Sequence, residues 1–355
     1  MCELFAMCSR FPAAVDICLD ELARHGGQTG PHRDGWGISY YAEDGAVQLY
    51  KEAEPASGSD WVHFIQEHHL RSTIVLSHIR RATQGGCSLN NTQPFRRELG
   101  GKCHVFAHNG DLVNIEGHPE FKLGFHRPIG ETDSEYAFCA LLGQLEQPWL
   151  STSGVPPLNQ RLAIIARFAR GLRRLGMASF IYSDGDAVFV HGDRRRHSAS
   201  EVPRPPGLHV LHRGWGMNSD GQGIEDLPIS SGSEWQEMAM VASVPLTAED
   251  WRPLGEGEVL ALRAGRVVGR VSSDRSIGRI RRKTATFKGG RAMDVATIKK
   301  EILDLSKDEK TKILTEVMPA LCREVLGDEA CKRTVKAVFG IDCVKELEDK
   351  LEYMI

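Results

Sequence analysis

The use of basic residues changes abruptly near residue 291, and this change restricts the chain to two differently built parts. Residues 1–291 contain 28 Arg, 5 Lys and 33 acidic residues, which gives a formal charge of 0. Residues 292–355 contain 2 Arg, 9 Lys and 14 acidic residues, which gives a formal charge of −3. A chain of 355 residues is also long enough for two domains. We therefore expect two modules of different origin, joined naturally or as a fusion.

Residues 294–355 are predicted to form a small bundle of helices. Their apolar residues recur at helical spacing in four stripes, which begin at Ile298, Ile313, Cys331 and Val344. The simplest interpretation is that these stripes form the core of the bundle rather than a cofactor or partner groove. Because a bundle of this size buries little apolar surface, we expect it to rely on a partner protein or on self-association.

A basic, glycine-containing linker is predicted over residues 273–293, after a first domain that spans residues 1–272. Residues 263–291 hold ten basic side chains and one acidic residue, Asp274. This stretch fits either a polyanion-binding arm or a solvated last strand followed by a flexible linker, and we favour the linker. The arginine-rich loop at 194–197 has no interleaved aromatic residues, so nucleic-acid binding is not expected.

The composition is typical of an ordinary soluble globular protein. The hydrophobic fraction is 41%, the charged fraction is 26%, and the net charge of −3 indicates no strong field for a nucleic acid or a membrane. No apolar run approaches the roughly 18 residues that span a bilayer, and the first residues lack the features of a secretory signal. The nine cysteines are an odd number without a Cys-x-x-Cys pair, so we expect a reducing cytoplasm rather than disulfides or a zinc ribbon.

The first domain is predicted to mix helices and strands. Helical periodicity covers residues 13–25, 59–70, 132–146 and 157–175. Strand-like runs cover residues 73–79, 104–108, 177–183, 187–191, 240–243 and 259–262. The turn Asp184-Gly185-Asp186 between two apolar runs indicates a hairpin. An α+β fold is therefore expected.

Cys2 follows the initiator methionine, so removal of Met1 makes it the N-terminal residue. Its α-amino group then titrates near about 7.7–8.0 and is partly a free base at neutral pH. This amine can take up the thiol proton without the help of a histidine. A cysteine at position 2 is weak evidence when it stands alone.

Three polar segments, at residues 77–83, 108–110 and 130–135, adjoin predicted strands and a predicted helix. The first contains arginine, whose guanidinium suits a bidentate clamp on a carboxylate. The second contains Asn109 and Gly110, which offer a side-chain amide and an unhindered backbone N–H to an oxyanion. The third contains Asp133, a carboxylate for an ammonium group. With a cysteine, these groups describe a site for hydrolysis of the glutamine amide.

In these stretches the sequence resembles the class II, or N-terminal-nucleophile, glutamine amidotransferases, and among them the compact stand-alone members. The resemblance covers roughly residues 2–272 and rests on the order and spacing of six stretches. They begin at Met1, Gly30, His78, Asn91, Ala107 and Gly130. The resemblance implies a four-layer αββα N-terminal-nucleophile sandwich, followed here by the small C-terminal helical module, and it implies no cofactor.

The resemblance also implies three catalytic groups. Cys2 attacks the amide carbon while its own amine moves the proton, and Asn109 and Gly110 form the oxyanion hole. A glutamyl thioester forms, ammonia or an amine leaves, and water completes the hydrolysis.

Substrate binding is assigned by the same resemblance to three further residues. Arg80 is expected to hold the α-carboxylate of glutamine, with Thr83 nearby, and Asp133 is expected to bind the α-amino group. Three positions around this pocket depart from the broader family pattern, namely Arg81, Gln84 and Gln93. The sequence therefore leaves open which acyl donor and which leaving group the site accepts.

The fourteen histidines do not predict a metal site. His104 and His108 lie four residues apart on a predicted strand, which places them on one face but about 13 Å apart. That separation is too large for both to bind one metal ion without a bend. Structural or solvated histidines explain the sequence better.

Three functions remain open at this stage. The leading hypothesis is hydrolysis of glutamine or of a γ-glutamyl amide or peptide, because the residues after 272 leave no room for a full synthetase or phosphoribosyltransferase domain. The second is a glutaminase that supplies ammonia to a separate synthase. The third is a non-catalytic regulatory module that keeps the fold. The presence of all the expected catalytic and binding residues favours an enzyme.

Overall fold

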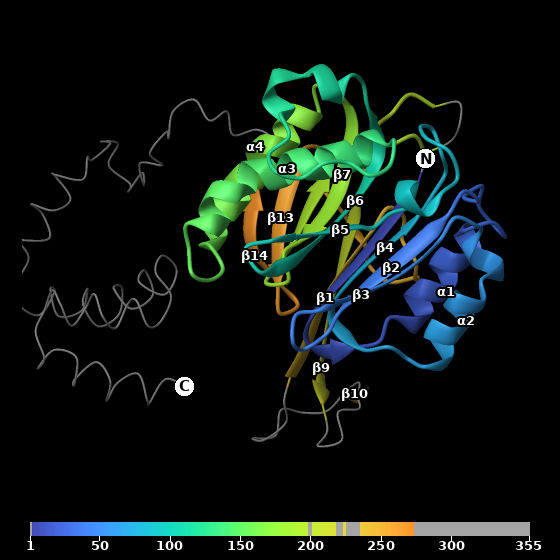
Figure 1. Cartoon of the computed structure of the whole chain (residues 1–355). Helices are drawn as coiled ribbons and strands as arrows, with labels where there is room; N and C mark the ends of the chain where they lie inside the picture. The colour runs from blue at the N-terminus through green and yellow to red at the C-terminus, as the bar shows by residue number, and fades with distance from the viewer. Residues whose placement is uncertain (1, 198–200, 218–222, 225–234, 273–355) are drawn as a thin grey trace, which may run out of the picture. The chain divides into compact units, whose positions relative to one another are not determined.

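The computed structural model describes residues 2–197, 201–217, 223–224 and 235–272 (Figure 1). The chain divides into two units, Met1–Ser276 and Ile277–Ile355, and all of the described residues belong to the first. The predicted linker at 273–293 and the predicted helical module at 294–355 lie outside the described residues, so both stay predictions.

Sheet A has eight strands, and the strand that follows Cys2 lies near its centre. The path of the sheet is β10-β9-β11-β1-β4-β2-β3, and β12 also pairs with β9. Every pairing in it is antiparallel. The strands are β1 (Glu3–Ala13), β2 (Trp36–Tyr41), β3 (Val47–Glu52), β4 (Ser72–Ile79), β9 (His209–Met217), β10 (Gly223–Ile224), β11 (Trp235–Ala242) and β12 (Arg252–Pro253).

Sheet B has six antiparallel strands in the order β14-β13-β8-β7-β6-β5. They are β5 (Phe95–Leu99), β6 (Lys102–Leu112), β7 (Gly176–Ser183), β8 (Val188–Gly192), β13 (Glu258–Arg263) and β14 (Arg266–Val271). The hairpin predicted at residues 184–186 is confirmed as the turn between β7 and β8. Gly185 there has a φ of +83°, a left-handed conformation that favours glycine.

Two pairs of helices cover the outer faces of the sheets (Figure 1). α1 (Asp16–His25) and α2 (Asp60–Glu67) lie on sheet A, and α3 (Asp133–Leu150) and α4 (Leu158–Leu172) lie on sheet B. The four helices agree with the four helical patterns of the sequence. Single 3₁₀ turns occur at Ala56–Gly58, Leu89–Asn91, Ile115–Gly117 and Pro119–Phe121. No helix among the described residues is long and apolar enough to cross a membrane.

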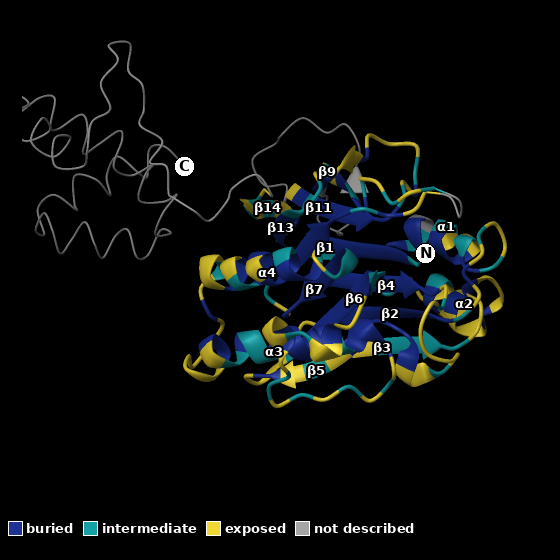
Figure 2. Ribbon diagram, turned by 90° about the horizontal axis from the view of Figure 1, so that it is seen from above, coloured by how far each residue is buried: buried dark blue, intermediate teal, exposed yellow. Residues whose placement is uncertain are grey.

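Three apolar layers hold the structure together. Most of the strand residues between them are buried (Figure 2). One lies between sheet A and α1–α2, one between the two sheets, and one between sheet B and α3–α4. Side chains of β1 alternate between the first two layers: Phe5 faces the helices, and Leu4 and Ala6 face sheet B. The expected αββα sandwich of the N-terminal-nucleophile type is therefore confirmed.

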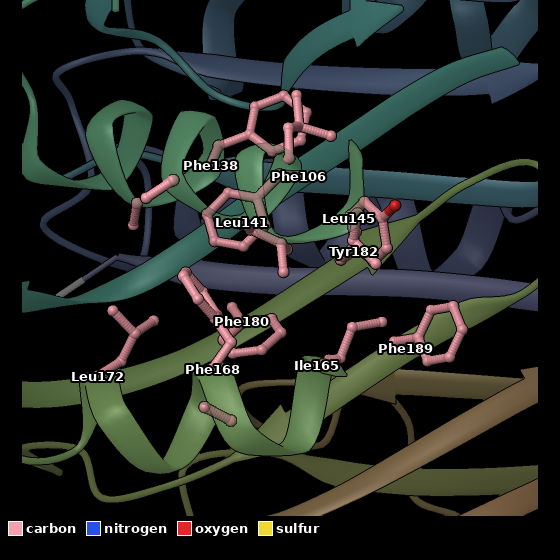
Figure 3. Close-up of a cluster of buried hydrophobic side chains, with 14 of the residues drawn as sticks. Phe106, Phe138, Leu141, Leu145, Ile165, Phe168, Leu172, Phe180, Tyr182 and Phe189 are labelled. Carbon is pink, nitrogen blue, oxygen red and sulfur yellow. The ribbon is translucent and has the colours of Figure 1, made fainter. Parts of the chain in front are cut away.

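The third layer is rich in aromatic rings (Figure 3). Phe168 of α4 lies edge-on to Phe121 and Phe180, with ring centroids 5.5 and 6.1 Å away. Phe106 of β6 stacks on Phe138 of α3 at 5.3 Å. Such rings bury large apolar areas and lock the orientation of α3 and α4 on the sheet. Asp133 lies at the first residue of α3, five residues before Phe138.

Candidate active site

Cys2 lies immediately before β1, beside the loop that follows β4. Glu3 pairs with Ile79 across these antiparallel strands, so Cys2 falls next to residues 80–81. The backbone N–H of Arg81 donates to Cys2 Sγ at 3.3 Å, and the Arg81 carbonyl oxygen is 3.4 Å from the same sulfur. Burial raises the pKa of the thiol, and the Arg81 backbone contact and the Arg80 charge only partly oppose this effect. The thiol therefore needs a base before it can attack.

Asn109 and Gly110 lie on β6, which runs past Cys2 on the neighbouring sheet. The side-chain Nδ2 of Asn109 donates to the backbone carbonyl of Cys2 at 2.6 Å, so the two residues are in direct contact. A Cβ atom on Gly110 would lie 1.8 Å from the carbonyl oxygen of Met177 on β7. Only glycine fits at position 110. Gly110 directly follows Asn109, so its backbone N–H lies next to the Asn109 residue.

Asp133 is held at the first residue of α3. Thr132 caps the helix, because its Oγ1 accepts from the backbone N–H of Glu135 at 3.2 Å. The carboxylate of Asp133 accepts from the backbone N–H groups of Leu112 and Ser134, both at 2.7 Å. It is close enough to Cys2 for its charge to raise the pKa of the thiol. A fixed carboxylate thus lies near the sulfur.

Arg80 makes a different set of contacts from the one expected. Its guanidinium is buried, with 3% of the residue exposed. Nη1 donates to the carbonyls of Asp34 and Gly86 at 3.3 and 3.1 Å, and Nη2 donates to those of Gln84 and Gly85 at 2.9 and 3.2 Å. Four of its five N–H donors thus bind loop backbone. In this conformation Arg80 organises the loop, and its role as a carboxylate clamp stays a prediction.

Residues from other segments also form hydrogen bonds with the loop after β4. Asp34 accepts from the backbone N–H of Ala82 at 2.7 Å, and its other oxygen lies 3.9 Å from Cys87 Sγ. Gln84 reaches across to Asp111 of β6, with Nε2 and Oδ1 2.6 Å apart. Thr83 lies exposed in the same loop, and no contact described here tests its predicted role.

Comparison with known proteins identifies the family. The family model described as "Glutamine amidotransferases class-II" matches residues 1–286. The chain belongs to the class II glutamine amidotransferases. The family resemblance read from the motifs is therefore confirmed.

Two relatives and one solved structure match this class II glutamine amidotransferase over most of their own length. The Escherichia coli protein "Putative glutamine amidotransferase YafJ" is 34% identical over 260 residues, which cover 73% of this chain and 96% of the relative. A Haemophilus influenzae protein, "Putative glutamine amidotransferase", is 30% identical over 272 residues, which cover 76% and 87%. A solved structure described as a "predicted glutamine amidotransferase from Pseudomonas aeruginosa PA01" is 28% identical, with a TM-score of 0.52 and coverage of 75% and 99%.

Sequence reasoning about this amidotransferase missed a chain of contacts behind the site. The side-chain amide of Gln93 bonds to both backbone groups of His108: Oε1 accepts from its N–H at 2.6 Å, and Nε2 donates to its carbonyl at 3.1 Å. The His108 ring lies 2.9 Å from Ser134 Oγ, which donates to Asp133 at 3.2 Å. Burial lowers the pKa of His108 and so favours the neutral ring, while the nearby Asp133 charge opposes this effect. The sequence analysis singled out Gln93 only as a position near the pocket, and the fold shows what it contacts.

The two histidines considered as metal ligands are engaged elsewhere. His104 lies 2.6 Å from Tyr182 Oη and 3.0 Å from the Leu99 carbonyl oxygen, and His108 contacts Ser134. Burial lowers the pKa of His104 to about 4. Within the described ranges, no three His, Cys, Asp or Glu side chains are grouped so as to hold a metal ion.

Proposed function

We propose that this class II glutamine amidotransferase hydrolyses the γ-amide of glutamine or of a γ-glutamyl compound, with Cys2 as the nucleophile after removal of Met1. The observation that carries the proposal is the direct contact between Asn109 and Cys2, at 2.6 Å. It joins an amide donor and a potential nucleophile that lie 107 residues apart in the sequence. A scaffold that only kept the fold would not require this pairing.

The proposed reaction has two halves. The free α-amine of Cys2 takes the thiol proton, and the sulfur attacks the amide carbon. Asn109 Nδ2 and the backbone N–H of Gly110 stabilise the negative oxygen of the tetrahedral intermediate. The C–N bond then breaks, the amine passes its proton to the leaving nitrogen, and a glutamyl thioester remains. Water attacks the thioester while the amine takes one of its protons, the C–S bond breaks, the proton returns to the sulfur, and glutamate leaves.

Substrate orientation is proposed to come from charge. The Asp133 carboxylate is fixed by two backbone N–H groups and lies near Cys2, which suits a substrate ammonium group. Arg80 would hold the α-carboxylate, with Thr83 beside it. Because loop carbonyls occupy four donors of Arg80, binding a carboxylate in a bidentate manner requires that some of these carbonyls be displaced.

The test is a substrate screen on the purified full chain, with ammonium release from glutamine and amine release from γ-glutamyl peptides as readouts. Cys2→Ala should lower turnover by several orders of magnitude without changing the thermal midpoint. Cys103→Ala is the matched control, because Cys103 is also partly buried. It lies at the start of β6, whereas Asn109 lies near the end of that strand. Cys103→Ala should keep normal turnover. A preparation that retains Met1 should be inactive, and full activity in such a preparation would contradict the mechanism.

If free ammonium appears only when a separate synthase is added, the enzyme serves as a glutaminase subunit instead. If neither the wild type nor Cys2→Ala turns over any of the substrates, with or without a synthase, the remaining hypothesis is a regulatory role.

A further inference from the structure

The loop Arg80–Cys87, called here the site loop, carries the backbone that touches the nucleophile. Arg81 contacts Cys2 Sγ through both its N–H and its carbonyl. One side of the loop is fastened to Asp34 through Ala82 and Cys87. The position of the site loop therefore decides where the sulfur of Cys2 can lie.

The opposite side of the site loop is tied to sheet B by one side-chain contact. Gln84 Nε2 donates to Asp111 Oδ1 at 2.6 Å. Gln84 is exposed and Asp111 is half-buried, so water competes with the bond. A hydrogen bond of this kind can bias a loop between two positions by about a factor of ten. It is too weak to decide whether the domain folds.

Asp111 is well placed to connect the loop with the chemistry. It lies two residues after Asn109 on β6, so the two side chains leave the strand on the same face. The next residue, Leu112, donates its backbone N–H to Asp133 at 2.7 Å. The bond from Gln84 to Asp111 thus connects the site loop with β6. The same strand carries Asn109 and contacts Asp133 through Leu112.

We propose that Gln84 and Asp111 form a latch that holds the site loop across Cys2, and that Gln84 is a positioning residue for the reaction. This inference rests on the proposed function of the site. The latched loop sets the place of the Arg81 backbone, which holds the sulfur, and of the residues expected to bind the substrate carboxylate. When the Gln84–Asp111 bond is broken, part of the substrate-binding free energy is used to order the site loop. We therefore expect KM to rise more than kcat falls.

The first experiment is a double-mutant cycle on glutamine hydrolysis with Gln84→Met, Asp111→Ala and the double variant. Each single change should lower kcat/KM about tenfold, mainly through KM, and the double change should be no worse than either single one. Gln48→Met is the control, because Gln48 is exposed on β3 in sheet A. It should leave kcat/KM unchanged. Single effects that multiply in the double variant would overturn the latch.

The second experiment exchanges the partners. Gln84→Glu places two carboxylates together and should lower kcat/KM more than Gln84→Met does. Adding Asp111→Asn to Gln84→Glu restores a donor–acceptor pair with reversed polarity and should recover most of the loss. Failure of this rescue in a folded protein would contradict a direct contact between the two side chains.

The third experiment does not depend on turnover. Hydrogen–deuterium exchange in the peptide that covers residues 81–88 should speed up about tenfold in Gln84→Met and Asp111→Ala, while exchange in β7 stays unchanged. Faster exchange in a chain that hydrolyses no substrate would support the latch and reject the proposed function. Active wild type with unchanged exchange in both variants would reject the latch and keep the function.

Discussion

Two regions of the described domain are stabilised in opposite ways. The layer between sheet B and the helices α3 and α4 is held by interlocking aromatic and aliphatic side chains (Figure 3). The site loop and the residues around Cys2 are held by hydrogen bonds between side chains and loop backbone. Apolar packing stabilises the fold roughly in proportion to the area that it buries, whereas each polar contact depends on two particular groups. The comparison suggests that stability and activity can be perturbed separately.

The largest expected effect on stability comes from the aromatic layer. Phe168→Ala removes a buried ring that contacts Phe121 and Phe180, and it should lower the free energy of unfolding by about 3–5 kcal/mol. Urea denaturation measures the loss. The folded fraction should keep the wild-type KM for glutamine, because no contact of Phe168 reaches Cys2. A change in KM without a change in stability would show that the two regions are coupled.

Asn109→Ala tests the polar region and should have the reverse signature. The variant removes one proposed oxyanion donor, so kcat should fall by about 10²–10³. Its thermal midpoint should change little, since one side-chain hydrogen bond, to the Cys2 carbonyl, is lost. Asn90→Ala provides the control, because Asn90 is exposed at the surface of the domain. Equal kcat values for the two variants would remove Asn109 from the chemistry.

Arg80→Lys tests whether Arg80 contributes to substrate binding, to the stability of the loop, or to both. Lysine cannot reproduce four bonds to the carbonyls of Asp34, Gln84, Gly85 and Gly86. We expect a rise in KM of about tenfold, together with a loss of stability of about 1 kcal/mol, because water can replace the lost donors at the exposed residues 84–86. Steady-state kinetics and urea denaturation on one preparation measure both. If KM is unchanged while stability falls, Arg80 serves only the loop, and Arg81 becomes the leading candidate for the carboxylate anchor.

The smallest effect is expected from removal of residues after about 290. None of the proposed catalytic positions lies there, so we propose that the truncated chain keeps its kcat/KM within about a factor of two. Its oligomeric state should change if the predicted helical module self-associates. Kinetics and size-exclusion chromatography decide both points. Loss of activity in a truncated chain that is still folded would mean that the tail completes the site.

Residue patterns predicted the helices, and they predicted strands where a run of apolar residues includes β-branched side chains. The four amphipathic helices and the strand at 73–79 agree with α1–α4 and with β4. The strand β1 was not predicted, because its sequence ELFAMCSRFPA contains none of the β-branched residues that are typical of strands. The strand β4 is buried on both faces as well, but its Thr, Ile and Val residues identify it. The edge strands β3 and β5 were missed because polar residues dominate them.

The sequence predicts the candidate site as a set of residues but carries no information about their contacts. The order of the motifs indicated Cys2, Asn109 and Asp133. In the structure Asn109 contacts Cys2, and the Asp133 charge raises the pKa of the Cys2 thiol. Their catalytic and binding roles stay predictions. The use of Arg80 by the loop depends on where the carbonyls of residues 84–86 point, and a sequence carries no information about that direction. The same holds for Gln93, which forms two bonds with the backbone of His108.

The place of β1 in sheet A has a consequence for how the protein is made. β1 pairs with β4 on one side and with β11 on the other, and Phe5 lies opposite Ala242. At roughly 5–20 residues added per second, the ribosome needs on the order of 10–50 s after β1 before β11 emerges. During that interval the first strand has no complete sheet to join, and we expect its end to be accessible to an aminopeptidase. The delay built into the strand order thus provides time for Met1 to be removed before the proposed nucleophile is enclosed.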